Sequence, residues 1–205
     1  MMQVTNGIRA VLSSPKIYDF FQNIMGANQI RQELVSDFIR PTDHFRVLDI
    51  GCGTARILEY LPKDVSYYGF DLSQTYIDDA KARYGSRGHF SCALVEQATI
   101  DSLAPFDAVL AVGVLHHLDN SQAIALMRLA HASLKQGGKL ITIDPTLVDG
   151  QNVIAKYLVK SDRGQNVRSP EEYYLLPNRI FSKISGQVKH RTFIPYTHWI
   201  MECQK

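Results

Sequence analysis

Short apolar segments alternate with helix-forming segments along most of this chain, and that alternation restricts it to few folds. Five segments have the apolar character of buried strands: 46–50, 65–70, 89–94, 106–112 and 139–143. Helices are predicted between them at 55–61, 74–84 and 120–135. Two closing strands, at 187–193 and 198–203, are close enough to pair antiparallel. The pattern predicts an α/β fold: a seven-stranded, mostly parallel sheet whose last strand is antiparallel, with helices on both faces.

Two segments lie outside the alternating core of this 205-residue chain. Residues 14–40 carry apolar side chains at helical spacing and end at Pro41, which predicts an N-terminal helical cap at about 1–40. Residues from about 146 to 185 hold no clear strand and many polar and tyrosyl side chains. We expect them to form a helical lid inserted after the fifth strand of a single domain, 1–205.

Charge and cysteine content argue against several classes of function. The net charge is +2 without a long basic run, so we expect no nucleic-acid partner. No stretch approaches the roughly 18 apolar residues of a membrane span. The three cysteines, Cys52, Cys92 and Cys203, fit neither a disulfide framework nor a zinc site, so we expect a cytoplasmic protein without a metal. Nothing in the sequence indicates an oligomeric state.

A glycine turn, Gly51-Cys52-Gly53, directly follows the first predicted strand. Glycines let the backbone approach a ligand closely, and ligands of open α/β sheets bind beyond the carboxyl ends of the strands. Asp71 ends the second strand, 18 residues after Gly53, where a carboxylate can accept both hydroxyls of a ribose. The turn and Asp71 together predict a nucleoside site, whereas the glycines alone could simply make a tight turn.

The residues around the turn differ from a dinucleotide site. The sequence continues as Thr54-Ala55-Arg56, so the last glycine of the pattern G-x-G-x-x-G is missing. Asp49 stands two residues before the turn, where its charge suits a ligand's ammonium group better than a pyrophosphate.

Four stretches in this order resemble class I S-adenosylmethionine-dependent methyltransferases, in particular the small-molecule enzymes of methyltransferase types 11 and 12. They are Val-Leu-Asp-Ile-Gly-Cys-Gly-Thr at 47–54, Gly-Phe-Asp-Leu-Ser at 69–73, the segment 106–118 that ends in Leu-His-His-Leu, and Leu-Lys-Gln-Gly-Gly-Lys-Leu at 134–140. The resemblance covers about residues 45–145 and implies a Rossmann-like domain with S-adenosylmethionine as cofactor and S-adenosylhomocysteine as product.

The resemblance also implies roles for single residues. Gly51, Cys52 and Gly53 would carry the methionine moiety and Asp49 its ammonium. Asp71 would hold the ribose and Leu72 the adenine. The remaining expected cofactor contacts are Val112 and Gly113 near the sulfonium, Glu96 (or a main-chain group) near the adenine amine, and Tyr18, which folds over the cofactor or else packs between helix and sheet.

Two residues at the carboxyl ends of later strands are candidates for catalysis. A sulfonium is a strong electrophile, so the protein needs a base only for an acceptor that is protonated at the working pH. His117 could take the proton of a hydroxyl acceptor, because an imidazole titrates near neutrality, or it could shape the substrate site. Asp144 lies at the same rim by topology and could instead cap the following segment.

Two later clusters, in the predicted lid and in the last turn, concentrate hydrogen-bond donors. Arg163 and Arg168 could grip an anionic group of the acceptor, and Tyr196 and His198 could bind beside them. The alternative is a solvated loop with local ion pairs.

The function predicted from the sequence is methyl transfer from S-adenosylmethionine to a small-molecule acceptor at a hydroxyl group, by in-line displacement. One alternative is a non-catalytic protein that binds S-adenosylmethionine or S-adenosylhomocysteine. Another is methylation of RNA or protein, which would favour a basic face or a recognition domain that this chain does not show.

Overall fold

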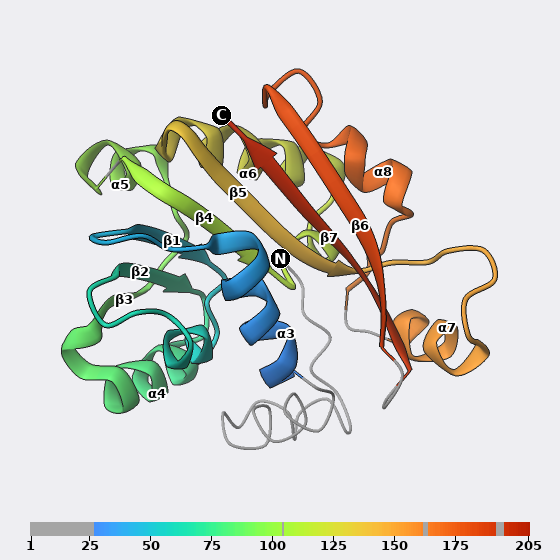
Figure 1. Ribbon diagram of the computed structural model, residues 1–205, viewed down its shortest axis with the longest axis horizontal. Helices are drawn as coiled ribbons and strands as arrows, with labels where there is room; N and C mark the ends of the chain where they lie inside the picture. Colours follow the sequence, from blue (N-terminus) through green and yellow to red (C-terminus); the bar gives the residue numbers. More distant parts are fainter. Residues whose placement is uncertain (1–26, 104, 162–163, 192–194) are drawn as a thin grey trace. The chain divides into compact units, whose positions relative to one another are not determined.

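The computed structural model describes residues 27–103, 105–161, 164–191 and 195–205 (Figure 1). The chain divides into two compact units, Met1–Leu94 and Val95–Lys205. Its seven strands follow the order β3-β2-β1-β4-β5-β7-β6, which divides into three strands of the first unit and four of the second. Each unit is described by itself below.

The first unit is a three-stranded parallel sheet with short helices. Its elements are α3 (Ala27–Glu33), a π-helix (Leu34–Ile39), β1 (Arg46–Ile50), a 3₁₀ helix (Arg56–Glu59), β2 (Ser66–Asp71), α4 (Gln74–Tyr84), a 3₁₀ turn (Gly85–Arg87) and β3 (Gly88–Cys92). Strand β2 lies between β1 and β3 and pairs parallel with both.

Local signals account for most of these boundaries. Helix α4 begins after Ser73, whose side chain accepts a hydrogen bond from the backbone N–H of Tyr76, and ends at Gly85, as the sequence predicted. Val47 and Leu48 of β1 are fully buried, so this strand forms the centre of the unit's core. The helix predicted at 55–61 is only a 3₁₀ turn, because Ala55 adopts a left-handed backbone conformation (φ 53°) and Pro62 follows closely.

The second unit contains the other four strands. Its elements are α5 (Gln97–Leu103), β4 (Phe106–Val112), a 3₁₀ turn labelled η4 (Leu115–His117), α6 (Asn120–Ser133), β5 (Leu134–Pro145), α7 (Val153–Lys160), α8 (Pro170–Leu175), β6 (Lys183–Arg191) and β7 (Tyr196–Gln204). Strands β4 and β5 pair parallel, and β7 runs antiparallel between β5 and β6. The predicted mostly parallel sheet of seven strands, with β7 antiparallel, is confirmed.

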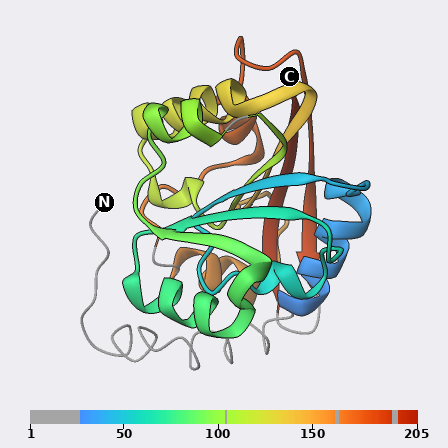
Figure 2. The ribbon, with the colours of Figure 1, turned by 90° about the vertical axis from the view of Figure 1, so that its left-hand side faces the viewer.

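Helices cover the strands of the second unit by packing apolar faces against them. Helix α6 contacts β4, β5 and α5, and α5 and α6 lie together beside the strands (Figure 2). Helix α7 contacts β7 and helix α8 contacts β6, so the predicted insertion at about 146–185 holds two short helices. In the part of the chain that is described, no helix has both the length and the apolar run needed to cross a bilayer.

Three details of the second unit differ from the sequence prediction. The helix predicted at 120–135 is α6, which ends at Ser133 and is capped by Asp119 in a reciprocal capping box with Gln122. Strand β5 begins at Leu134, since the two glycines at 137 and 138 continue the strand. Strands β6 and β7 are longer than predicted. Each further position of their ladder adds backbone hydrogen bonds, and no local sequence pattern marks these positions.

Candidate active site

The glycine turn of the first unit is held against the end of β2 by its own backbone. The N–H groups of Gly51 and Cys52 both donate to the Phe70 carbonyl, at 2.7 and 3.0 Å. Gly51 and Gly53 have positive φ angles of 75° and 55°, a conformation that glycine adopts without steric cost. The helix after the turn has only four residues, so the turn's backbone, and not a helix end, forms this part of the site.

Asp71 joins the two loops of the first unit at the carboxyl ends of β1 and β2. One carboxylate oxygen accepts the N–H of Gly53 at 2.9 Å, and the other accepts the N–H of Ser73 at 2.8 Å. Each oxygen keeps a further lone pair, so the carboxylate can still accept two ligand hydroxyls. A Cβ built on Gly53 would meet no atom within 4 Å, which shows open space beside the turn.

Close packing around Gly69 of β2 fixes the position of the glycine turn. A Cβ on Gly69 of β2 would lie 2.9 Å from Cys52 Sγ and 2.9 Å from a ring carbon of Tyr67. Only glycine fits there without a shift of the turn. Burial raises the pKa of the Cys52 thiol far above its usual range, so this side chain packs as a small apolar group and is no nucleophile.

Asp49 presents a buried carboxylate at the base of the turn. It is 5% exposed, and the Tyr67 hydroxyl donates to it at 2.6 Å. Burial, reinforced by the negative charge of Asp71, raises the pKa of Asp49 to about 7. Within the described residues its hydrogen-bond partner is a tyrosine and not a cation, so the site fits a ligand that brings an ammonium group.

The raised pKa of Asp49 gives a test on the protein without ligand. An unfolded aspartate titrates near pH 4, so the buried group's contribution to stability is fully present below about pH 4 and is lost as the pH rises through about 7. An Asp49→Asn variant stays neutral and keeps an acceptor for Tyr67. We expect its free energy of unfolding to exceed the parent's by roughly 1–2 kcal/mol more at pH 8 than at pH 5.5. Urea unfolding at the two pH values measures this, and an equal difference at both would contradict it.

The other residues predicted to contact the cofactor belong to both units. Leu72 directly follows β2 and is 51% exposed, as an adenine contact would require. In the second unit, Val112 ends β4, Gly113 has a φ of 69° and donates to the Ile143 carbonyl at 2.7 Å, and Glu96 is exposed before α5. Tyr18 lies outside the described residues. The cofactor roles of these residues stay predictions.

A buried histidine–aspartate pair lies where β4 and β5 end in the second unit. His116 Nδ1 is 2.8 Å from Asp144 Oδ1, and the backbone N–H of His116 donates to the same oxygen at 3.1 Å. Their side chains are 6% and 1% exposed. An oxygen that already accepts the backbone N–H acts as an acceptor for the ring as well. Nδ1 therefore carries the proton, and Nε2 keeps its lone pair.

Of the two catalytic candidates predicted from the sequence, Asp144 belongs to this pair and His117 does not. Burial raises the pKa of Asp144, while its hydrogen bonds from His116 oppose that rise. His117 is half-buried, and its ring lies against the His116 ring with centroids 4.0 Å apart. The sequence favoured His117, and its catalytic role stays a prediction, but the residue that the fold joins to Asp144 is His116. No local signal separates two adjacent histidines, because the pairing depends on a strand 28 residues away.

Arg168, expected to grip an acceptor, is buried and bonded to the protein itself. It is 6% exposed and donates to the carbonyls of Leu115 and Leu118 at 2.9 and 2.6 Å. Two further bonds reach the Asn166 carbonyl and the Asn120 side chain, both at 3.0 Å. These bonds occupy four of the five N–H donors of a guanidinium, so direct contact with an acceptor is not the role that this geometry supports. Arg163, its predicted partner, lies outside the described residues.

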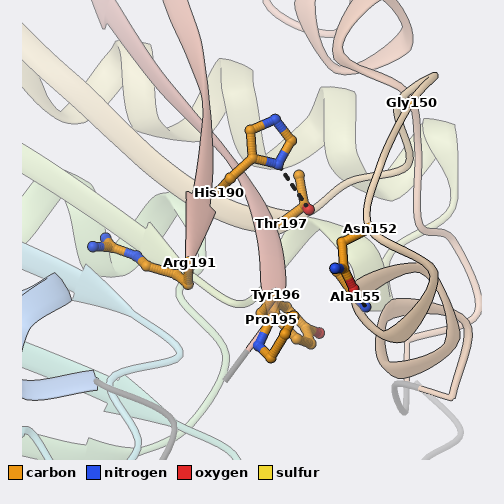
Figure 3. A pocket seen from close by; sticks show the side chains of 8 residues that line it. All are labelled: Gly150, Asn152, Ala155, His190, Arg191, Pro195, Tyr196 and Thr197. Atoms are coloured by element: carbon orange, nitrogen blue, oxygen red, sulfur yellow. Dashed lines mark hydrogen bonds between the residues drawn. The ribbon is translucent and has the colours of Figure 1, made fainter. Parts of the chain in front are cut away.

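A pocket of about 300 Å³ opens at the ends of β6 and β7 (Figure 3). It is lined by Gly150, Asn152, Ala155, His190, Arg191, Pro195, Tyr196 and Thr197. His190 Nδ1 lies 3.3 Å from the Thr197 hydroxyl, and the side chain of Arg191 extends away from these two (Figure 3). Tyr196 lines this pocket, and its role at an acceptor site stays a prediction. His198 is not among the lining residues and packs on Tyr196, with ring centroids 4.8 Å apart.

Among the described residues, no three His, Cys, Asp or Glu side chains are grouped to hold an ion.

Comparison with known proteins agrees with the fold and the glycine turn. Residues 48–140 match the family model described as "Methyltransferase domain". The chain is 30% identical over 141 residues to the "Ubiquinone biosynthesis O-methyltransferase" of Xylella fastidiosa, and 32% identical over 151 residues to the protein of that name from Bradyrhizobium diazoefficiens. These alignments cover 65% and 66% of this chain but 56% and 58% of the relatives, so the chain spans less than two thirds of either relative.

A solved structure shows the same fold over its whole length. The S-adenosylmethionine-dependent methyltransferase from Archaeoglobus fulgidus matches with a TM-score of 0.69, covering 92% of this chain and 99% of that one at 15% sequence identity. These similarities support the class I S-adenosylmethionine-dependent methyltransferase superfamily for this chain. The cofactor of this superfamily is S-adenosylmethionine.

Proposed function

We propose that this chain transfers the methyl group of S-adenosylmethionine to a hydroxyl of a small-molecule acceptor. The observation that carries the hydroxyl assignment is the buried hydrogen bond of 2.8 Å between His116 and Asp144. A hydroxyl is protonated at neutral pH and gains from a base during methyl transfer. The names of the two curated relatives, both O-methyltransferases, support the same acceptor atom.

The first unit would hold the cofactor through groups of matching charge. The buried carboxylate of Asp49 would pair with the ammonium, the backbone of Gly51 and Gly53 would lie along the methionine moiety, and Asp71 would accept the ribose hydroxyls. When bound, S-adenosylmethionine supplies a methyl group on a positively charged sulfur, which keeps the electron pair of the broken carbon–sulfur bond. Asp49 and Asp71 would act by binding and orienting, which brings a large part of the rate of such a transfer.

In the second unit, His116 would act as the base. Asp144 Oδ1 holds the ring with the proton on Nδ1, so Nε2 is the basic atom. As the acceptor oxygen takes the methyl group, its proton would go to Nε2. The charge gained by the ring would be balanced by the Asp144 carboxylate. After the transfer, the His116–Asp144 pair would hold the acceptor's proton and release it to solvent.

The pocket beside Tyr196 would take part of the acceptor. About 300 Å³ is the lower end of the range for small-molecule sites and suits a single aromatic ring. Its polar groups include the imidazole of His190, the hydroxyl of Thr197 and the amide of Asn152, while the Arg191 side chain extends away (Figure 3). We therefore favour a neutral hydroxylated ring over the anionic acceptor that the arginines had suggested. Three free cysteines support a reducing cytoplasm as the location.

Methyl transfer from labelled S-adenosylmethionine tests the proposal. The purified chain is incubated with phenols and catechols, and in parallel with matched anilines, thiophenols, RNA and total protein. We expect label in the hydroxylated compounds, recovered as methyl ethers identified by mass spectrometry. Preferential label in an amine, a thiol or a polymer would contradict an oxygen acceptor. Tight cofactor binding without release of S-adenosylhomocysteine in a complete metabolite extract would instead support the non-catalytic binding protein.

A further inference from the structure

Arg168 makes an unusual set of contacts for a buried cation. Its guanidinium donates four hydrogen bonds, three to backbone carbonyls and one to a side-chain amide, and none of these acceptors is a carboxylate. Burying a guanidinium costs free energy that hydrogen bonds to neutral carbonyls offset only in part. The acceptors are not scattered: Leu115 and Leu118 flank the two histidines of η4, and Asn120 starts α6. The guanidinium therefore clamps the turn that carries His116.

The backbone of the same segment holds the other member of the pair. The Thr146 hydroxyl donates to the Arg168 carbonyl at 2.9 Å, and Thr146 and Arg168 form a parallel β-bridge. Thr146 follows Asp144 by two residues, directly after β5. Arg168 thus binds η4 through its side chain and the end of β5 through its main chain.

Two neighbours of Arg168 press against His116 directly. The N–H of Asn166 donates to the His116 carbonyl at 2.9 Å. A Cβ on Gly164 would lie 2.0 Å from His116 Cδ2 and 2.6 Å from its carbonyl oxygen, so the chain at this glycine is in close contact with the ring. The ring cannot turn without displacing this segment, because protein interiors are closely packed.

We propose that Arg168 is a positioning residue that fixes His116 against Asp144 for proton transfer. It connects the two backbone segments from which the pair projects, and so keeps the Nδ1–H of His116 directed at Asp144 Oδ1. This replaces the direct acceptor contact expected from the sequence. The inference rests on the proposed function, since the orientation of His116 matters to chemistry only if His116 is the base.

The experiment compares Arg168→Lys and Arg168→Met with Arg128→Met, which removes an arginine from an exposed site on α6. Long-range ¹H–¹⁵N spectra of the full chain labelled in its histidines report the His116 tautomer, with His116→Gln assigning the signal. We expect a single Nδ1–H form in the parent and in Arg128→Met, and mixed tautomers in both Arg168 variants. Turnover should fall about 100-fold in Arg168→Met, with acceptor KM and cofactor Kd within about twofold of the parent.

Other outcomes decide against the proposal in distinct ways. A folded Arg168→Lys variant with the parent's tautomer and turnover would overturn it. A rise in the acceptor KM without a fall in turnover would indicate instead that Arg168 contacts the acceptor directly. If Arg168→Met does not fold, Arg168→Lys and Asn120→Ala, which removes a single acceptor, carry the test. If the parent transfers methyl to no acceptor, the proposed function fails, yet the tautomer spectra still show whether Arg168 orients His116.

Discussion

An Asp71→Ala variant is expected to bind S-adenosylmethionine about 100-fold more weakly than the parent. Hydrogen bonds to a charged acceptor contribute roughly 1.5–3 kcal/mol each, and the ribose offers two hydroxyls. The substitution also leaves the N–H groups of Gly53 and Ser73 without their shared acceptor, so the turn itself loosens. Isothermal titration calorimetry measures the loss directly and needs no knowledge of the acceptor.

Two comparisons separate ribose binding from general damage to the fold. Asp78→Ala removes an exposed carboxylate from α4, next along the chain, and should bind the cofactor like the parent. Asp71→Asn keeps one acceptor oxygen for the turn and should give an intermediate loss. Parent-like affinity in Asp71→Ala would overturn the assignment of the whole cofactor site.

A His116→Gln variant should lose turnover by about 10²–10⁴-fold at saturating cofactor, the range that a general base contributes. Glutamine has nearly the length of histidine and can still hydrogen-bond to Asp144, but its amide does not take a proton at neutral pH. Affinity for the cofactor should stay within about twofold, because His116 is not among the residues assigned to cofactor binding. Steady-state kinetics with any acceptor found in the labelling assay provides the measurement.

His117→Gln is the matched control, since it changes the adjacent ring that stacks on His116 without touching Asp144. We expect it to alter turnover by less than about tenfold. The reverse order of the two effects would make His117 the base, as the sequence analysis had favoured. Equal, small effects in both variants would remove general-base catalysis from the mechanism.

The parts of the fold that sequence predicted are those with local causes. Strand β4 matches its predicted range because six of the seven residues in Phe106–Val112 are apolar, and Ser73 and Gly85 mark both ends of α4. Helix α5 was missed, since seven residues with no acidic side chain in the first turn give little helical signal. Strand β6 begins before its predicted start and β7 extends past both predicted ends, because pairing across the hairpin adds residues that no local pattern marks.

The site residues also divide into those that have a local sequence signal and those that do not. The glycine turn, Asp49 and Asp71 were identified because ligand chemistry, backbone geometry and strand position coincide within 23 residues. The His116–Asp144 pair joins residues 28 positions apart, and Arg168 reaches Leu115 across 53. Such contacts depend on which loops meet after folding. Arg168 was therefore expected to contact an acceptor, or else solvent, although it is bound inside the unit.

The buried carboxylate of Asp49 has a consequence for regulation. The ammonium that it would hold belongs to the amino-acid end of the cofactor, which is the same before and after the methyl group leaves. If Asp49, Gly53 and Asp71 hold the cofactor as proposed, they would bind the spent cofactor nearly as tightly as the fresh one. Product inhibition should be strong, and the rate in the cell should follow the ratio of S-adenosylmethionine to S-adenosylhomocysteine more closely than the amount of either.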